Sequence, residues 1–504
     1  MLIEVQGRKG TTQRKEKNMS RIPTQSVLTD NQVDRINEEV MKILTEIGVD
    51  FEYAPAVEVL KEHGCKVDGS RVIFDRKFVE DRIAEAPSEF TLKARDEKKS
   101  TWCGDGSFIL TPSYGPPFVY TLEGGRRGTT SEDYNNVVKL CHMSQNINHT
   151  GHNVVEMCDY PDEIRHLKMI ESHIKYSDKA FMGAAHGSVC AKDTVEMCKI
   201  LYGMDDETIK NTPIVNTLIN SITPLKYDER MASALMTYAE YGQSNLISSL
   251  VMSGSTGPVT MVETLSLQLA ETIAGLCLNE CIRPGSPVIL GSTSGPADFA
   301  SMALSIGNSE VALYIAATAQ MGRFYGVPTR GGGGQNDAIL TDAQAGMESM
   351  LTLLAPAISG TAFILHAAGI MHYYNAFSYE KFIMDDEVAG WCNKFIQGFN
   401  FDEERFVFDD VEEVGPGGHF LYQDSTMDYM DELRRPLINN RKDYEGWEAA
   451  GAKSLDKVCS DRWTKQLEEY VAPEMDEAVE AELNAFIEKR CNELIGSSPA
   501  LYMR

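Results

Sequence analysis

Two aromatic-rich stretches hold the side chains with the most distinctive chemistry in this sequence, SYGPPFVY at residues 113–120 and HYYNAFSY at residues 372–379. The faces of aromatic rings attract cations, and they are the usual partners of a quaternary ammonium group, which has no N–H to donate. The alternative is that these rings pack apolar surfaces together, and we expect that of about half of them. The rings predicted to surround a cation are Tyr114, Phe118, Tyr373, Tyr374 and Phe377.

A run of four glycines follows Arg330 in the stretch RGGGGQNDAILTDAQAG. Glycine weakens strands and helices, so such a run is used where the backbone turns sharply or approaches another group closely. Its N–H groups could hold a phosphate. However, Arg330 is the only Lys or Arg nearby, and no Ser or Thr lies within the run. A substrate or another protein is the alternative occupant.

The histidines and cysteines give no sign of a metal site or of an activated nucleophile. Cys141, His142, His149 and His152 lie close in the sequence, but their spacing matches no structural zinc pattern. A GxSxG turn, the mark of many serine hydrolases, does not occur in the sequence. The sequence therefore predicts neither a bound metal nor a hydrolase.

Eight short apolar segments alternate with amphipathic helical stretches, which is the order of elements in a TIM (β/α)8 barrel. A doubly wound open sheet is the alternative, but it usually has about five to seven strands and a glycine fingerprint after the first. We therefore predict an α/β barrel. The predicted strands are GSFILTP, NINHTGHNVVE, KAFMGAA, PIVNTLINS, SNLISSLVM, SPVILGSTSG, GVPTRGGGG and TAFILHAAG.

Active sites of this fold lie at the carboxyl ends of the strands, so the residues that close each apolar segment are candidates. The glycine run then forms the loop after the seventh strand. The two aromatic stretches follow the first and the eighth strands, which are neighbours in a closed barrel. The further site residues predicted at strand ends are His186, Asn220, Arg330, Gly333, Gln335 and His366.

Additional helical regions are expected on both sides of the barrel. We divide the chain into a flexible extension over residues 1–20, an N-terminal helical layer over 21–100, the barrel over 101–375 and a C-terminal helical region packed on it over 376–504. The N-terminal layer is indicated by Thr29, which can cap a helix, followed by an apolar stripe from Val33 to Ile47.

The net charge of -27 and the pI near 4.8 argue against a nucleic-acid-binding protein, which needs clustered Lys and Arg. We see no signal peptide and no apolar run of membrane-spanning length, and therefore expect a cytoplasmic protein without a membrane partner. The eleven cysteines form no CxxC pair, which favours reduced thiols over a disulfide framework.

The chain resembles the trimethylamine methyltransferase family from about Arg21 to its C-terminal region. The resemblance rests on the order of the pieces EEVMKILTEIGVDF, VEDRIAEAPSEFTLKARD, GGRRGTTSEDYNNVVKL, TDAQAGMES, LHAAG and SYEKFIMDDEVAGW. It implies a TIM barrel that passes a methyl group from an amine to Co(I) of cobalamin carried by a corrinoid protein. The chain itself would bind no cofactor tightly, and we also expect a homo-oligomer.

Leu340 stands where the family's trimethylamine enzymes carry pyrrolysine. The sequence is therefore similar to the members without pyrrolysine, which demethylate quaternary amines such as glycine betaine, carnitine or proline betaine. A quaternary amine leaves as a neutral tertiary amine and needs neither a proton nor a covalent adduct. The predicted catalytic positions are Glu263, Gln335 and Leu340, and Leu340 is the one that matches the family's pyrrolysine.

The resemblance also gives Arg330 and the glycine run a role, because a betaine carboxylate needs hydrogen-bond donors. Glu263 could form an acidic wall of the site, although a Glu in the first turn of a helix is expected equally often for structural reasons. Two alternatives stay open. One is a phosphate-binding barrel lyase or isomerase, and the other is a betaine-binding or corrinoid-docking protein without turnover.

Overall fold

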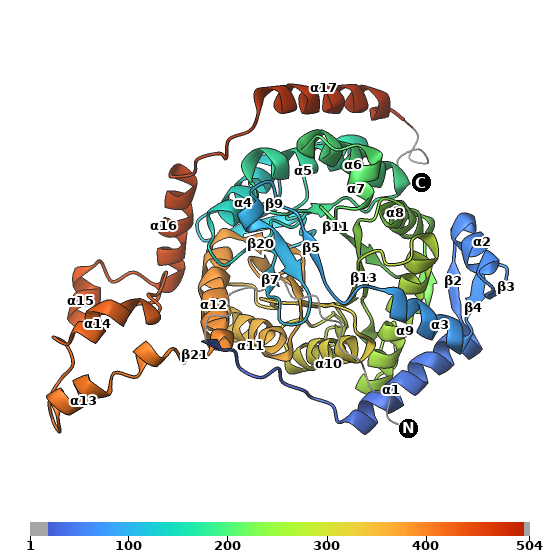
Figure 1. Ribbon diagram of the computed structural model, residues 1–504. Coiled ribbons are helices and arrows are strands. Elements are labelled where there is room, and N and C mark those ends of the chain that lie inside the picture. Colours follow the sequence, from blue (N-terminus) through green and yellow to red (C-terminus); the bar gives the residue numbers. More distant parts are fainter. Residues whose placement is uncertain (1–18, 498–504) are drawn as a thin grey trace.

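Parallel strands curl into a barrel at the centre of the molecule (Figure 1). The structure is a computed structural model that describes residues 19–497. Seven strands pair in the order β10-β11-β13-β15-β17-β18-β7, each parallel to its neighbours. They are β7 (Ile109–Leu110), β10 (Met182–Gly183), β11 (Asn216–Asn220), β13 (Ser244–Ser249), β15 (Val288–Ser292), β17 (Thr329–Gly332) and β18 (Phe363–Leu365).

The chain between β7 and β10 supplies the eighth strand and closes the barrel. The His149 N–H donates to the Leu110 carbonyl at 3.2 Å, and His149 pairs in parallel with Ala180. The Thr150 N–H donates to the Ala180 carbonyl at 2.9 Å. This segment lies in NINHTGHNVVE, so all eight predicted strands form the barrel and the predicted TIM-barrel fold is confirmed.

Eight helices alternate with the strands and form the outer ring (Figure 1). Several begin where a side chain can accept from a free N–H of the first turn, as Asn308, Asp342 and Ser378 do. The ring helices are α4 (Ser131–Met143), α5 (Asp162–Tyr176), α6 (Ser188–Tyr202), α8 (Glu229–Glu240), α9 (Met261–Ile282), α10 (Ser309–Tyr325), α11 (Ala343–Ser359) and α12 (Tyr379–Gln397).

Helix α9 corrects the expectation that no apolar run reaches membrane-spanning length. Its 22 residues meet that test by length and composition, but 83% of the apolar window is buried inside the protein. The helix packs against β13 and β15 on the barrel side and against α1 (Asp30–Lys42) and α3 (Arg76–Glu85) of the N-terminal layer. Because protein covers both sides, α9 lacks the polar stripe of a surface helix.

The N-terminal layer covers this side of the barrel with α1, α2 (Ala54–Glu62), α3 and a small sheet. The sheet has the order β12-β2-β4-β3, with β2 (Val49–Phe51), β3 (Lys66–Asp68), β4 (Arg71–Ile73) and β12 (Lys226–Tyr227). Only β4 was expected from the sequence. The predicted flexible extension over residues 1–20 lies outside the described residues except for Met19 and Ser20, which form β1.

A second small sheet joins the loops that follow β7 and β18. Its order is β19-β20-β8-β9, with β8 (Phe118–Thr121), β9 (Gly125–Gly128), β19 (Ile370–Met371) and β20 (Ala376–Ser378). The parallel pair β20–β8 places Ala376 opposite Phe118 and Phe377 opposite Val119. The two aromatic stretches therefore lie side by side, as the closed barrel predicts.

The C-terminal region extends beyond the barrel after α12, which completes the helical ring. Helix α16 (Leu455–Glu468) packs on α12 and α4, and α17 (Glu477–Leu494) packs on α5 and α6. Along the chain, four elements come between α12 and α16: β21 (Phe399–Asn400), α13 (Phe408–Val414), α14 (Asp424–Tyr429) and α15 (Tyr444–Ala449). Figure 1 shows α13, α14 and α15 projecting away from the barrel.

Candidate active site

Arg330 lies at the carboxyl-terminal end of the barrel in β17, with 1% of its surface exposed. Its Nη1 donates to the Ser292 carbonyl at 2.9 Å and to Ser248 Oγ at 3.3 Å. Its Nη2 donates to His366 Nδ1 at 3.2 Å. The Nε–H has no hydrogen-bond partner among the described residues. The buried guanidinium therefore keeps its Nε–H and one Nη2 proton free for a ligand.

The charge of Arg330 is not balanced by an acidic side chain. Across residues 19–497 no carboxylate forms an ion pair with it, and the titratable groups that act on it are the phenols of Tyr374 and Tyr114. Burial lowers the pKa of Arg330 to about 10, so the side chain stays charged near neutral pH. A buried charge without a partner is costly, and an anion bound beside it would offset that cost.

His366 connects Arg330 to the aromatic residues. Its ring centroid lies 4.7 Å from that of Tyr374, and its Nδ1 accepts from Arg330. Burial and the neighbouring positive charge of Arg330 hold the pKa of His366 well below its usual value. The ring is therefore neutral at physiological pH, and it adds no second positive charge to the site.

Tyr374 and Gln335 form the next part of the same cluster. Gln335 Nε2 donates to the Tyr374 hydroxyl, while Gln335 Oε1 is buried without a partner among the described residues. Burial raises the pKa of Tyr374 to about 12, so the phenol keeps its proton. The phenol of Tyr114 also interacts electrostatically with Arg330.

The backbone that carries Tyr374 is unusual. His372, Tyr373 and Tyr374 have positive φ values of 53°, 56° and 71°, and His366 has a φ of 66°. Left-handed backbone at residues other than glycine costs on the order of 1–3 kcal/mol each, and it is concentrated at functional sites. The turn directs Tyr374 to Arg330 and leaves Tyr373 38% exposed at the surface.

Two of the predicted cage rings pack elsewhere. Phe377 is fully buried in the core, 5.2 Å from the ring of Tyr379, which is the alternative expected for some of these rings. The face of Phe118 is covered by the Arg126 guanidinium at 3.8 Å. Of the five predicted rings, the structure brings only Tyr114 and Tyr374 together with Arg330.

The glycine run packs closely rather than forming a ligand cradle. The Gly333 N–H donates to the Leu365 carbonyl at 2.9 Å, so this predicted substrate-binding group is already used. A Cβ on Gly333 would lie 2.4 Å from Ile364 Cγ2, and one on Gly331 would lie 2.4 Å from Ile315 Cγ2. The expected binding of a carboxylate by the Gly333 amide is corrected accordingly, and the Arg330 Nε–H is a donor that stays available.

Two of the three predicted catalytic positions lie away from Arg330. Glu263 occupies the first turn of α9, where the charges acting on it are those of Glu39, Arg35 and Lys42. It therefore faces α1 and forms no acidic wall in the barrel mouth. Leu340 lies in the loop between β17 and α11 and is 51% exposed, so it presents an apolar side chain to the solvent. Gln335 is the one that joins the cluster.

His186 and Asn220 mark the other side of the mouth. Asn220 ends β11 and is half-buried. His186 follows β10 and lines a cavity of about 230 Å³ together with His152, Glu156 and Arg230. Neither residue touches the cluster around Arg330 through a hydrogen bond found in the described part of the chain.

A buried ion pair that sequence reasoning missed supports both loops of the cluster. Lys381 Nζ lies 2.7 Å from each carboxylate oxygen of Asp385 and donates to the Gly334 carbonyl at 3.1 Å. Asp385 accepts from the Gly369 N–H at 2.8 Å. The pair therefore ties the loop after β17 to the loop after β18. The spacing of Lys and Asp by four residues in KFIMD was the available signal.

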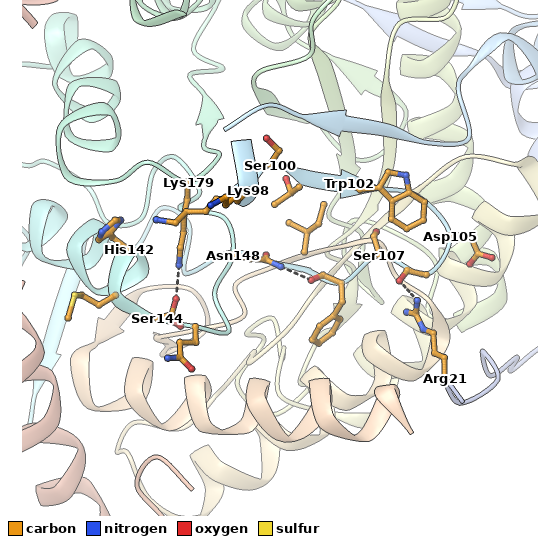
Figure 2. Close-up of a pocket in the computed structure, with 17 residues that line it drawn as sticks. Arg21, Lys98, Ser100, Trp102, Asp105, Ser107, His142, Ser144, Asn148 and Lys179 are labelled. Carbon is orange, nitrogen blue, oxygen red and sulfur yellow. Dashed lines mark hydrogen bonds between the residues drawn. The ribbon is translucent and has the colours of Figure 1, made fainter. Parts of the chain in front are cut away.

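A groove lies at the opposite, amino-terminal end of the strands (Figure 2). It has a volume of about 1030 Å³, and Lys179 lines it. Lys179 Nζ donates to the carbonyls of Cys141, Ser144 and Ile147 at 2.6–2.7 Å, so its donors serve the end of α4 and the following turn. Residues at this end of a TIM barrel usually contribute to stability, whereas catalytic residues lie at the opposite end.

The sequence pattern of the trimethylamine methyltransferase (MTTB) family matches residues 4–495. The chain belongs to this family. It is 49% identical to the glycine betaine methyltransferase of Desulfitobacterium hafniense over 94% of this chain and 98% of the relative. It is 28% identical to the proline betaine:corrinoid methyltransferase of Eubacterium limosum over 81% of this chain and 86% of the relative.

Trimethylamine methyltransferases of Methanosarcina species are similar to this chain at lower identity. The chain is 26% identical to the trimethylamine methyltransferase of Methanosarcina barkeri over 92% of this chain and 95% of the relative. Among solved structures, the monomethylamine methyltransferase of Methanosarcina barkeri aligns with a TM-score of 0.47 at 12% identity, covering 90% of this chain and 96% of that one.

Proposed function

We propose that this protein transfers a methyl group from a carboxylated quaternary amine, of the glycine betaine class, to Co(I) of cobalamin carried by a corrinoid protein. The observation that carries the proposal is the buried, unbalanced Arg330 beside the rings of Tyr114 and Tyr374. One such site offers an anion partner and a cation partner next to each other. The relatives named for betaines support the same substrate class.

The reaction requires no acid or base catalysis by the protein. Co(I) attacks a methyl carbon, the C–N bond breaks, and its electron pair stays on nitrogen to give a neutral tertiary amine. No proton moves, which agrees with a neutral His366 and a protonated Tyr374 in the cluster. The protein has to hold the substrate with one methyl group facing the mouth, and such orientation alone supplies a large part of many rate accelerations.

The two halves of the site suit the two ends of the substrate differently. The carboxylate keeps its charge throughout the reaction, so the Nε–H of Arg330 can bind it tightly without opposing catalysis. The ammonium loses its charge in the transition state, so a close carboxylate there would stabilise the ground state more than the transition state. Aromatic faces hold the cation more weakly, and the absence of an acidic partner for Arg330 in the described structure fits this need.

The methyl acceptor reaches the site through the barrel mouth, where we expect the corrinoid protein to dock. None of the eleven cysteines, all of which lie within the described residues, forms a disulfide, which suits the reducing cytoplasm in which we place the reaction. Phosphate chemistry is the weaker alternative, because the Gly333 N–H already donates to the Leu365 carbonyl and Arg330 is the only Lys or Arg near the glycine run in the sequence.

A methyl-transfer assay tests the proposal directly. The purified protein is incubated with Co(I) cobalamin and one amine at a time, and the absorption spectrum reports the methylated cobalamin. We expect glycine betaine, carnitine or proline betaine to react, and choline, which offers only a hydroxyl, to react much more slowly. Ligand binding without any methylation would indicate a binding protein. A thermal shift with phosphate but with no betaine would favour the lyase or isomerase alternative.

A further inference from the structure

Residues 399–433 form an arm that leaves a large apolar surface uncovered. The arm contains β21, α13 and α14, and Figure 1 shows the two helices away from the barrel. The side chains of Phe408 and Leu421 are each 71% exposed, and that of Tyr422 is 87% exposed. Monomeric soluble proteins rarely present so many large apolar side chains together, so such a surface marks an interface. Other large apolar arm residues with more than half of their surface exposed are Phe399, Phe401, Phe406, Val411, Met427 and Leu433.

The arm holds its own shape. Arg405 lies 3.0 Å from Glu432 and stacks over the ring of Tyr429 at 4.0 Å, and Ser425 hydrogen-bonds Asp410. At its base, the Arg434 guanidinium lies 2.9 Å from Glu387 of α12. These contacts fix the arm while leaving its apolar side chains outward, so the surface is presented rather than produced by unfolding.

The charge of the arm narrows the choice of partner. Residues 399–433 carry eleven Asp or Glu and one Arg. Two such arms would repel each other, so pairing of one arm with another is disfavoured. The partner surface has to be apolar and basic, which is uncommon on a chain with a net charge of -27.

The segment directly after the arm provides such a surface. A groove of about 860 Å³ lies between α15 and the start of α16. Its apolar walls include Tyr444 and Trp447, and its rim carries Arg441 and Lys442, both exposed. Residues 434–458 contain six Lys or Arg against four Asp or Glu, so this is a basic patch on an acidic chain.

We propose that the arm of one copy of this chain lies in the 438–458 groove of a second copy, and that the second arm returns to the first groove. No residue of the same copy's arm lines this groove, and the base of that arm is tied to Glu387 through Arg434. A reciprocal exchange uses the same surface on both subunits and closes as a twofold dimer. The proposal gives the expected homo-oligomer a specific interface, and it does not depend on the methyl-transfer reaction.

Sedimentation velocity over a range of protein concentrations tests the exchange. We expect the full chain to be a dimer or a larger assembly of dimers at micromolar concentration. Leu421→Asp with Tyr422→Asp on the arm, and separately Arg441→Glu with Lys442→Glu on the groove, should each raise the dissociation constant at least about ten-fold. Val471→Asp is the matched control, because Val471 is 76% exposed but belongs to neither surface, and its assembly should be unchanged.

A charge-reversal pair separates this interface from any other. Asp409→Lys with Asp410→Lys on the arm should weaken the dimer alone and restore association when mixed with the Arg441→Glu, Lys442→Glu chain. Circular dichroism spectra equal to that of the unaltered chain confirm that each variant is folded. A monomeric full chain, unchanged assembly of the arm variants, or failure of the mixed pair to reassociate would each overturn the proposal.

Discussion

Replacing Arg330 with Met is the substitution that most directly tests the site. The guanidinium donates through Nη1 to Ser292 and Ser248 and through Nη2 to His366, which leaves Nε and one further Nη2 proton for a substrate carboxylate. Two charge-assisted hydrogen bonds contribute roughly 3–5 kcal/mol in total. The substitution should therefore lower kcat/KM for glycine betaine by roughly two to four orders of magnitude.

Choline makes the assay specific, because it carries the same trimethylammonium group without a carboxylate. Its kcat/KM should change little in the Arg330→Met variant, so the preference between the two substrates should collapse. Glycine betaine should also raise the unfolding temperature of the unaltered protein and fail to do so for the variant. Arg330→Lys, which keeps the charge but loses the planar fork, should retain part of the preference.

Stability provides the internal control for this substitution. Met removes an unbalanced buried charge, which stabilises the fold, but it leaves the Ser292 carbonyl and His366 Nδ1 without a donor, which destabilises it. Each effect changes the free energy of unfolding by about 1–3 kcal/mol, and the two oppose each other. A folded variant with equal losses for betaine and choline would show that Arg330 shapes the site without binding the carboxylate. Unchanged activity toward betaine would refute the reasoning altogether.

Four further results are expected from the same structure. Trimethylamine and dimethylglycine should give little or no methylated cobalamin, since neither has a quaternary nitrogen and the amine that leaves would need a proton or a covalent adduct; turnover equal to that of glycine betaine would contradict this. Tyr374→Leu should raise the KM for betaine by about 2- to 30-fold through loss of about 0.5–2 kcal/mol of cation–π binding, whereas Phe377→Ala should mainly lower the unfolding temperature, because Phe377 fills the core. Lys381→Met should destabilise the fold by about 3–5 kcal/mol, measured by denaturant unfolding, because it leaves a buried carboxylate unpaired. Burial opposes charging of His166, but Cys190 and the Asp193 carboxylate at 2.9 Å together raise its pKa to about 9. The protonated ring therefore stabilises the fold fully below about pH 6.5, by at most roughly 3 kcal/mol, and this stabilisation should be lost as the pH rises to 9. The His166→Gln variant should not show this pH-dependent loss of stability.

The barrel was predictable because its strands are buried and regularly spaced. The segment TAFILHAAG is apolar on both faces, and the strand in SNLISSLVM is buried along its length, as strands covered by helices outside and side chains inside must be. The sheet of the N-terminal layer was not predictable in the same way. Its strand β12 comes from a barrel loop more than 150 residues away in the sequence, and such a pairing leaves no local signal.

The sequence predicted which residues meet in the site better than it predicted the role of each one. Arg330, His366, Tyr374 and Gln335 do meet, since strand ends converge in a closed barrel. Whether a ring faces a ligand or the core depends on the turn that carries it, and positive φ values at consecutive Tyr residues cannot be read from a sequence. The same holds for Glu263, which the sequence could place equally well at a helix start, where the structure has it.

The burial of Arg330 explains why a run of glycines follows it. Arg330 can reach Nδ1 of His366 only if β17 and β18 run close together beneath a tightly packed helical ring. Side chains at Gly331 and Gly333 would displace Ile315 on one side and Ile364 on the other, and each displacement would separate the layers that bury the guanidinium. Bare backbone is therefore needed here to keep a charged side chain away from water and away from any acid. An arginine held in this way binds a carboxylate more strongly than an exposed one could, because water neither competes for it nor screens it.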